Sequence, residues 1–334
     1  MMKRRKLIAA MLAAPAATVG LRPAWAAPVF INLGSGSTRG LYDPTASTMA
    51  DIINDADIPI RAYVHATGGS VDNCRQIVSG KLQMGLAQSN IAWYAYQGSG
   101  IDAFEGKPGR ELRGMLMLYP EVIHILVRKL AGISSVADLK GKLVYVGDTG
   151  SGTVEDVVNV LTAAGLTTGD LRAAVRGNAG DAVNLLVDGQ IDAMFYTVGV
   201  GSRAVTQALE SGQIDLLDVP QQLLAALHEK FPFYTALTLP AGTYRGIAHP
   251  VSTITLRAML VATSSLPADA VQNFMETVFV KNLERLYDKA LNPNLKRYFQ
   301  LETALDGMPI PLHAGAEAFF REHGQAVPDA VRAI

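Results

Sequence analysis

The chain has 334 residues, of which 49% are hydrophobic and 18% charged, enough to bury the core of one large or two modest domains. Beyond the N-terminus it has no stretch of 18 or more uninterrupted apolar residues, so the body of the chain is not expected to span a membrane. A formal net charge of −1, without a basic run past the N-terminus, argues against nucleic acid as a partner.

The N-terminus has the three parts of a secretory signal peptide. A basic stretch, Lys3–Lys6, precedes the small-residue apolar run Leu7–Leu21, and Ala24–Ala26 forms an A-x-A cleavage site. We therefore expect residues 1–26 to be removed and the mature protein to be periplasmic. The pair Arg4 and Arg5 leaves twin-arginine export open as the alternative to general secretion. Cleavage removes five basic residues and no acid, which takes the formal charge from −1 to −6.

Apolar strands and amphipathic helices alternate through the rest of the chain. The first half predicts strands at Val29–Leu33, Ile60–Thr67 and Leu82–Gln88 and helices at Pro44–Asn54 and Val71–Ser79. The second half predicts strands at Leu143–Val146, Leu171–Arg176 and Ile191–Thr197 and helices at Val154–Ala164 and Asp181–Asp188. A glycine stops most of these helices, and βα units of this length are typical of mostly parallel sheets.

A repeated pattern predicts two lobes of one plan. The segment "DNCRQIVSGKLQMGLAQS" (72–89) aligns without a gap to "DAVNLLVDGQIDAMFYTV" (181–198). Each follows a strand and a Gly-Ser-Thr turn, "LGSGST" (33–38) or "DTGSGT" (148–153), and these turns are expected to face each other across a cleft.

Two long apolar runs, Met115–Lys129 and Val251–Ser265, are expected to cross between the lobes and form a hinge. The predicted division is residues 27–125 for the first part of lobe 1, 126–254 for lobe 2 and 255–334 for the return to lobe 1. The tail between residues 267 and 323 is expected to be helical and to pack on lobe 1.

The sequence lacks the signatures of common enzyme and metal sites. It contains no H-E-x-x-H, C-x-x-C, G-x-S-x-G or Walker motif, and its six histidines never recur at i and i+4. The turn "GSGSTRG" (34–40) resembles a dinucleotide fingerprint, but no acid ends a second strand to bind a ribose. The single cysteine, Cys74, cannot form an internal disulfide and is expected to be a buried helical residue. We therefore expect no catalytic residue, metal or cofactor.

Three loops instead combine backbone N–H groups with small hydroxyls, and each leads into a helix. They are "GSGST" (34–38), "TGGS" (67–70) and "GSGT" (150–153). Such loops suit a carboxylate, because the N-terminus of a helix carries free N–H groups and a partial positive charge. The alternative for each single loop is helix capping, for which Ser70 and Thr153 are suitable residues.

Five motifs add a family resemblance: "ATGGSVDN" (66–73), "LYPEVIHILV" (118–127), "DLKGKLVYVGDTGSGT" (138–153), "FYTALTLPAGTY" (233–244) and "PIPLHAGAEAFFREHG" (309–324). With these motifs in order, the chain resembles the TAXI-type substrate-binding proteins of TRAP (tripartite ATP-independent periplasmic) transporters, from about residue 29 to 324. The resemblance implies an α/β, type II periplasmic-binding-protein fold with two lobes and a hinge.

The resemblance also implies a function without catalysis. The protein is expected to capture a small carboxylate, such as glutamate, glutamine or 2-oxoglutarate, by lobe closure and to deliver it to the membrane subunits of a TRAP permease. A ligand sensor that passes its bound state to a signalling partner is the alternative. A monomer suffices to form the site.

The candidate ligand-binding residues lie in these loops and at two strand ends. They are Ser35, Gly36, Ser37, Thr38, Arg39, Tyr42, Thr67, Gly68, Gly69, Ser70, Gln88, Ser89, Gly150, Ser151, Gly152, Thr153, Tyr196 and Thr197. Two of them keep an alternative: Tyr42 could pack in the core, and Arg39 could extend into solvent rather than clamp a carboxylate.

Overall fold

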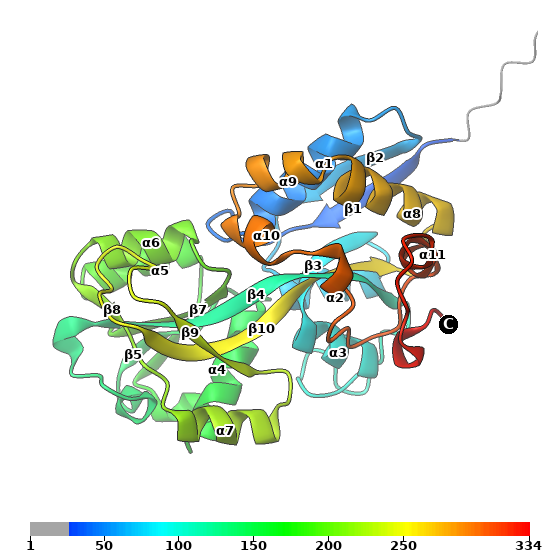
Figure 1. Ribbon diagram of the computed structural model, residues 1–334. Coiled ribbons are helices and arrows are strands. Elements are labelled where there is room, and N and C mark those ends of the chain that lie inside the picture. Colours follow the sequence, from blue (N-terminus) through cyan, green and yellow to red (C-terminus); the bar gives the residue numbers. More distant parts are fainter. Residues whose placement is uncertain (1–26) are drawn as a thin grey trace, which may run out of the picture.

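The computed structural model describes residues 27–334. The expected signal peptide, residues 1–26, lies outside the described residues and stays a prediction. The described chain forms two α/β lobes connected by two long strands that run through both (Figure 1).

Lobe 1 is built on a parallel triplet of strands, β1 (Val29–Gly34), β2 (Ile60–His65) and β3 (Met84–Gln88), in the order β2-β1-β3. Its helices are α1 (Tyr42–Asp55), α2 (Ser70–Val78) and α3 (Ser89–Gln97). The predicted elements of this half are confirmed, with α1 beginning two residues earlier than expected. Cys74 lies on α2 and is fully buried, as predicted.

Lobe 2 repeats the plan with β5 (Leu143–Tyr145), β6 (Ala173–Val175) and β7 (Ala193–Val198) in the order β7-β5-β6. Its helices are α4 (Gly152–Ala163), α5 (Ala179–Val187), α6 (Arg203–Glu210) and α7 (Gln221–Lys230), and the short strands β8 (Ile214–Leu216) and β9 (Thr235–Leu239) complete it. The two triplets mirror each other in strand order, which confirms the duplication predicted from sequence.

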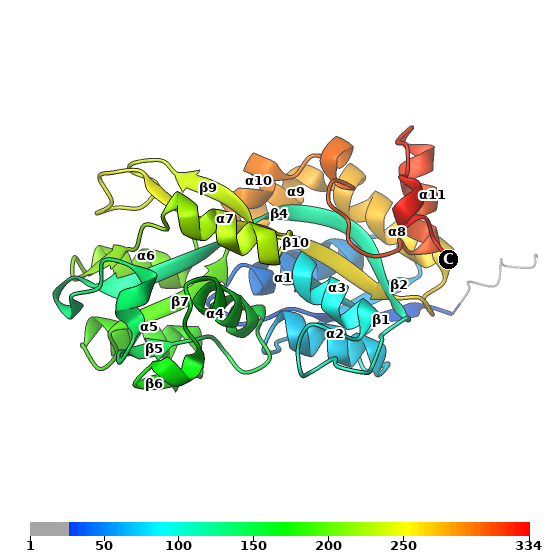
Figure 2. The ribbon, with the colours of Figure 1, turned by 90° about the horizontal axis from the view of Figure 1, so that it is seen from below.

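The crossing strands are β4 (Leu112–Arg128) and β10 (Val251–Thr263), which pair antiparallel with each other and lie between the two triplets (Figure 2). The full order is β2-β1-β3-β10-β4-β7-β5-β6, with β9 beside β10 and β8 beside β4. The expectation of mostly parallel sheets is wrong, because five of the nine strand pairings among the described residues are antiparallel. β10 runs antiparallel to β3 of the first triplet and β4 runs antiparallel to β7 of the second, and no local pattern in the sequence specifies these directions.

The pairing of β4 with β10 is irregular midway between the lobes. Pro120, which has no N–H to donate, stands opposite Arg257, and the register shifts between Arg257 and Met259. Just beyond, the hydroxyl of Thr255 donates to the carbonyl oxygen of Glu121 at 2.8 Å. The pairing between the lobes is thus interrupted beside Glu121, whose backbone carbonyl is held by Thr255.

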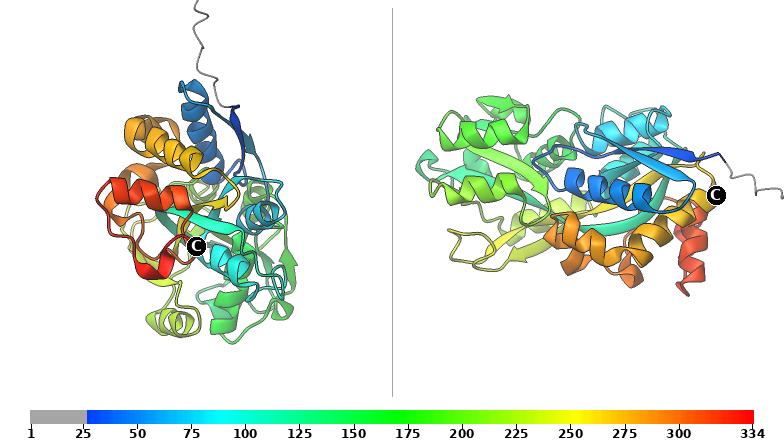
Figure 3. Two further views of the ribbon diagram at one scale, coloured as in Figure 1. Left: turned by 90° about the vertical axis from the view of Figure 1, so that its right-hand side faces the viewer. Right: turned by 90° about the horizontal axis from the view of Figure 1, so that it is seen from above.

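The C-terminal helices lie beside lobe 1 (Figure 3). They are α8 (Ala268–Glu276), which continues into a π-helical turn at Thr277–Lys281, α9 (Leu283–Lys289), α10 (Pro293–Tyr298) and α11 (Ala314–Glu322). Short 3-10 turns occur at Lys129–Ala131, Val136–Leu139, Thr168–Asp170, Leu301–Thr303 and Asp329–Val331. Among residues 27–334, no helix is both long and apolar enough to cross a membrane.

Candidate functional site

A cavity of about 50 Å³ lies between the lobes. Lobe 1 lines it with two loops and the end of β3, lobe 2 lines it with the start of α4 and the end of β7, and Glu121 of β4 lies between them. Its lining residues are Gly36, Ser37, Gly40, Leu41, Tyr42, Gly68, Gly69, Ser70, Gln88, Glu121, Asp148, Ser151, Gly152, Thr153, Tyr196, Thr197 and Val198. A volume of this size holds about four water molecules, so it suits a small solute.

Three helices, α1, α2 and α4, begin at this cavity. Their N-cap residues are Leu41, Gly69 and Ser151, and none of these side chains accepts a hydrogen bond from its own helix. The N–H groups of the first turns are therefore left without a side-chain cap, and such groups together with the helix dipole attract an anion.

The capping alternative for Ser70 and Thr153 is wrong, because both residues lie inside their helices. The Ser70 hydroxyl accepts a bond from the backbone N–H of Gln88 at 3.1 Å, and the Thr153 hydroxyl accepts one from Thr197 at 3.2 Å. Each hydroxyl thus ties the start of a helix to the end of the neighbouring strand. Within each lobe, this bond places the helix N-terminus beside the strand end that carries Gln88 or Thr197.

Two acids contribute the charged side chains of the lining. Glu121 is 3% exposed, and the Tyr42 hydroxyl donates to its Oε2 at 2.6 Å. Burial raises the pKa of Glu121 to about 8, the charge of Asp156 adds to the effect, and the bond from Tyr42 opposes it. Asp148 accepts a bond from the Tyr145 hydroxyl at 2.6 Å, and burial raises its pKa as well. Among residues 27–334, no arginine, lysine or histidine lines the cavity.

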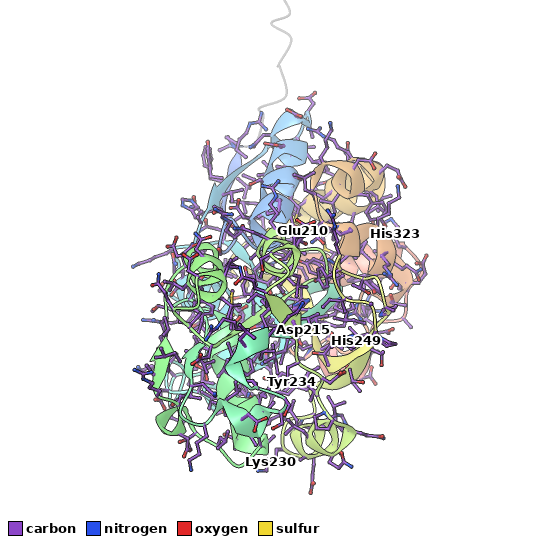
Figure 4. The ribbon with its side chains drawn as sticks, turned by 90° about the vertical axis from the view of Figure 1, so that its left-hand side faces the viewer. Glu210, Asp215, Lys230, Tyr234, His249 and His323 are labelled. Carbon is purple, nitrogen blue, oxygen red and sulfur yellow. The ribbon has the colours of Figure 1, made fainter. Side chains whose placement is uncertain are left out.

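Behind the cavity, Asp156 of α4 connects the lobes. Its carboxylate is fully buried and accepts bonds from Gln88 Nε2 at 2.7 Å and Asn90 Nδ2 at 3.1 Å, both from lobe 1. From its own lobe it accepts bonds from the hydroxyls of Thr197 and Tyr234, each at 2.6 Å. Tyr234 precedes β9 and is labelled within lobe 2 in Figure 4. The bonds from Gln88 and Asn90 exist only while the lobes are closed on each other.

The surface along which the two lobes touch, here called the seam, includes Gly68, Gly150 and Gly152. At Gly68 and Gly152 there is no room for a side chain. A Cβ atom added to Gly152 would overlap Oε1 of Gln88, and one added to Gly68 would overlap the carbonyl oxygen of Thr149 in the other lobe. Across the same seam the N–H of Asp72 donates to the carbonyl oxygen of Gly150 at 3.1 Å. The glycines of the predicted loops therefore permit close approach of two backbones.

Aromatic rings close a second part of the seam. Phe233 of lobe 2 packs against Trp93 and Tyr94 of α3, with ring centroids 5.4 and 5.7 Å apart. On the opposite side Asn294 donates to the carbonyl oxygen of Val200 at 2.7 Å. Contacts between the lobes thus extend beyond the cavity, to this aromatic cluster and to α10.

Most of the predicted site residues lie at this cavity. Those in the lining are Gly36, Ser37, Tyr42, Gly68, Gly69, Ser70, Gln88, Ser151, Gly152, Thr153, Tyr196 and Thr197. Two lining atoms, Gln88 Oε1 and Ser151 Oγ, are buried and have no hydrogen-bond partner in the described part of the chain. Because Gln88 Nε2 is already bound to Asp156, Oε1 is the atom that remains for a solute.

Six predicted residues lie outside the lining: Ser35, Thr38, Arg39, Thr67, Ser89 and Gly150. The Ser35 hydroxyl donates to Asp43 at 3.0 Å, the Thr67 hydroxyl donates to Asn73 at 2.8 Å, and Ser89 begins α3. Thr38 is exposed, and Gly150 makes the backbone contact of the seam. Arg39 is exposed and donates to Gln207 of α6 at 3.4 Å, which favours the alternative of a surface arginine over a clamp.

Five lining residues were not among the predicted ones: Gly40, Leu41, Glu121, Asp148 and Val198. Two of them carried a signal in the sequence. Asp148 opens the motif "DTGSGT", and Glu121 is the single acid in the apolar crossing run Met115–Lys129. An acid is unusual in a buried strand, and Glu121 stands where β4 lines the cavity.

A family model described as NMT1-like matches residues 33–324. The chain belongs to the NMT1-like family. Among solved structures, the alkanesulfonate-binding protein SsuA from Xanthomonas axonopodis pv. citri bound to MOPS is 15% identical, with 92% of this chain and 97% of that chain covered and a TM-score of 0.51. The periplasmic aliphatic sulphonate binding protein SsuA from Escherichia coli is 15% identical over 89% of this chain and 84% of its own, with a TM-score of 0.47.

The likeness to the Xanthomonas protein confirms the fold predicted for this NMT1-like chain, an α/β periplasmic-binding-protein fold of two lobes. At 15% identity it shows the fold alone, and the solute is not carried over from it.

Proposed function

We propose that this NMT1-like protein is a periplasmic solute receptor for import, which captures a small solute carrying a carboxylate by closure of its two lobes. The observation that carries the proposal is the convergence of three helix N-termini without side-chain caps, from both lobes, on one cavity. A carboxylate there can accept N–H bonds from α1 and α2 of lobe 1 and from α4 of lobe 2 at the same time. Only the closed arrangement offers all of these donors together.

Capture then follows from the contacts of the seam. Opening at the irregular stretch of β4 and β10 breaks the bonds from Gln88 and Asn90 to Asp156 and exposes a buried carboxylate to water. Closing restores those bonds and buries the solute. A solute that bonds to both lobes shifts this equilibrium toward the closed form by its difference in affinity for the two forms.

We further propose that the closed form is recognised by a membrane importer. The expected signal peptide and the TAXI resemblance together support a TRAP-type permease as that importer, with sensing as the alternative. Transport into proteoliposomes that contain the permease, with and without this protein, separates the two. Solute uptake that does not depend on this protein would leave sensing as the better explanation.

Binding itself is tested on the mature chain, residues 27–334, with thermal shift and small-angle X-ray scattering. We expect a small carboxylic or amino acid to raise the melting temperature and to lower the radius of gyration. Chemical turnover of the bound compound would overturn the proposal, because Glu121 and Asp148 are acids of a kind that enzymes also use. A panel of such acids that neither stabilises nor compacts the protein would overturn it as well.

A further inference from the structure

We propose that the solute carries a protonated amine beside its carboxylate, and that Glu121 and Asp148 hold this amine. The solute class is then a small amino acid and not a dicarboxylate. This inference rests on the proposed function, since it concerns the same cavity.

The lining divides into a donor side and an acceptor side. The donors are the N–H groups at the starts of α1, α2 and α4. The acceptors are the carboxylates of Glu121 and Asp148 and the unpartnered oxygen of Gln88, which is 98% buried, since the residue is 2% exposed. An ammonium group has three donors and no acceptor, so it matches the second set.

The charge balance points the same way. Among residues 27–334, two acids and no base line the cavity, so the second carboxylate of a dicarboxylate would find no cation to pair with and would become a like charge to either acid that is ionised. Like charges in a buried site repel strongly because little water screens them. A zwitterion places its carboxylate at the helix N-termini and its ammonium group at the acids. Both the N–H donors and the acceptor oxygens of the lining then have partners.

The cavity also limits the size of the solute. Its volume of about 50 Å³ suits an amino acid with a short side chain in the closed form. Gly68 and Gly152, which line the cavity, already contact the opposite lobe, so the cavity cannot widen there while the lobes are closed. Selection for short side chains therefore follows from the same glycines that allow closure.

Glu121 is set to change its protonation when the amine binds. The groups that face it are the hydroxyl of Tyr42 on α1, Tyr119 on its own strand, Asp156 on α4 and Tyr196 on β7. None of these is a cation, so a neutral Glu121 is favoured at pH 7 without solute, in line with its pKa of about 8. An ammonium beside it favours the ionised form, and binding must then release a proton.

The experiment compares matched pairs of probes by isothermal titration calorimetry at pH 7. L-Alanine is paired with propionate, and L-glutamate with glutarate, so that each pair differs in the amine. We expect L-alanine to bind at least tenfold more tightly than propionate and to release a proton, seen as a dependence of the binding heat on the ionisation heat of the buffer. L-Glutamate that binds more tightly than L-alanine contradicts the limits on side-chain size and charge. A partner that binds equally well overturns this inference and leaves the proposed function standing. Absence of binding by every probe overturns both.

The variant Glu121→Gln keeps the shape of the side chain and removes its charge. We expect it to lose at least tenfold in affinity for the amino acid, to keep its affinity for the deaminated partner and to release no proton. Glu229→Gln, at an exposed position on α7, is the matched control and should behave as the wild type. An unchanged preference for the amine in Glu121→Gln contradicts the assignment of Glu121, and the wild-type proton release tests it even where the variant folds poorly.

Discussion

The buried carboxyl of Glu121 makes a quantitative prediction for stability without any solute. Its folded pKa is about 8, against 4.5 for the ordinary side chain, so the folded protein binds this proton more tightly than the unfolded chain does. The stability that this group contributes is therefore fully present below about pH 4.5 and is lost as the pH rises to 8. At 1.36 kcal/mol per pH unit, the difference of about 3.5 units corresponds to a loss of about 5 kcal/mol as an upper value, and of about 3 kcal/mol at pH 7.

Glu121→Gln removes this penalty because its amide stays neutral. We expect the variant to match the wild type near pH 4 and to gain stability relative to it as the pH rises, by up to about 5 kcal/mol at pH 8. Urea denaturation of wild type, Glu121→Gln and the exposed control Glu229→Gln between pH 4 and 9 measures the difference. A difference between Glu121→Gln and wild type that stays flat across this range would refute the reasoning, because it would mean that Glu121 is ionised in the folded protein throughout.

Three further substitutions test the closed arrangement. Gly152→Ala should weaken solute binding at least tenfold, because its new Cβ meets Gln88 in the closed form. It should not lower stability, because alanine suits the start of a helix. X-ray scattering with and without solute measures the loss of closure, and Gly169→Ala on a surface turn is the control. Asp156→Asn replaces one acceptor oxygen by a donor that faces two of the four donors, so we expect a loss of about 3 kcal/mol in the free energy of unfolding, measured by denaturation, and no loss would contradict the bonding described. Arg39→Ala removes one exposed bond to α6 and should change affinity by about twofold or less, whereas a loss above tenfold would restore the arginine to the site as a carboxylate clamp.

Local patterns predicted the parts of the fold that are local. The strands and helices follow from apolar periodicity and glycine stops, and the repeated segment 72–89 and 181–198 predicted the mirrored lobes because each βα unit is specified within about twenty residues. The direction of β4 and β10 was missed because it depends on the pairing of segments more than a hundred residues apart.

The sequence likewise predicted the local parts of the candidate site and missed the residues that distant segments bring together. The glycine loops were predicted, since the need for close backbone approach appears in the sequence as glycine. Glu121 was missed, because the cavity beside it is formed by loops and helix starts far from β4 in the sequence. Asp156 was missed because its four donors come from three separate segments of the chain. The sequence could not decide whether the Arg39 side chain points to the cavity or to solvent, because its partner, Gln207, belongs to the other lobe.

The most direct test of the central claim, that the lobes close on a small carboxylate solute, is to identify what the protein carries. Wild type and Gly152→Ala are purified in parallel under native conditions, denatured, and the released small molecules measured by mass spectrometry. We expect the wild type to release one small compound with a carboxyl and an amino group, and Gly152→Ala to release little or none. Release of a compound without a carboxyl group, or of equal amounts from both proteins, would contradict the claim.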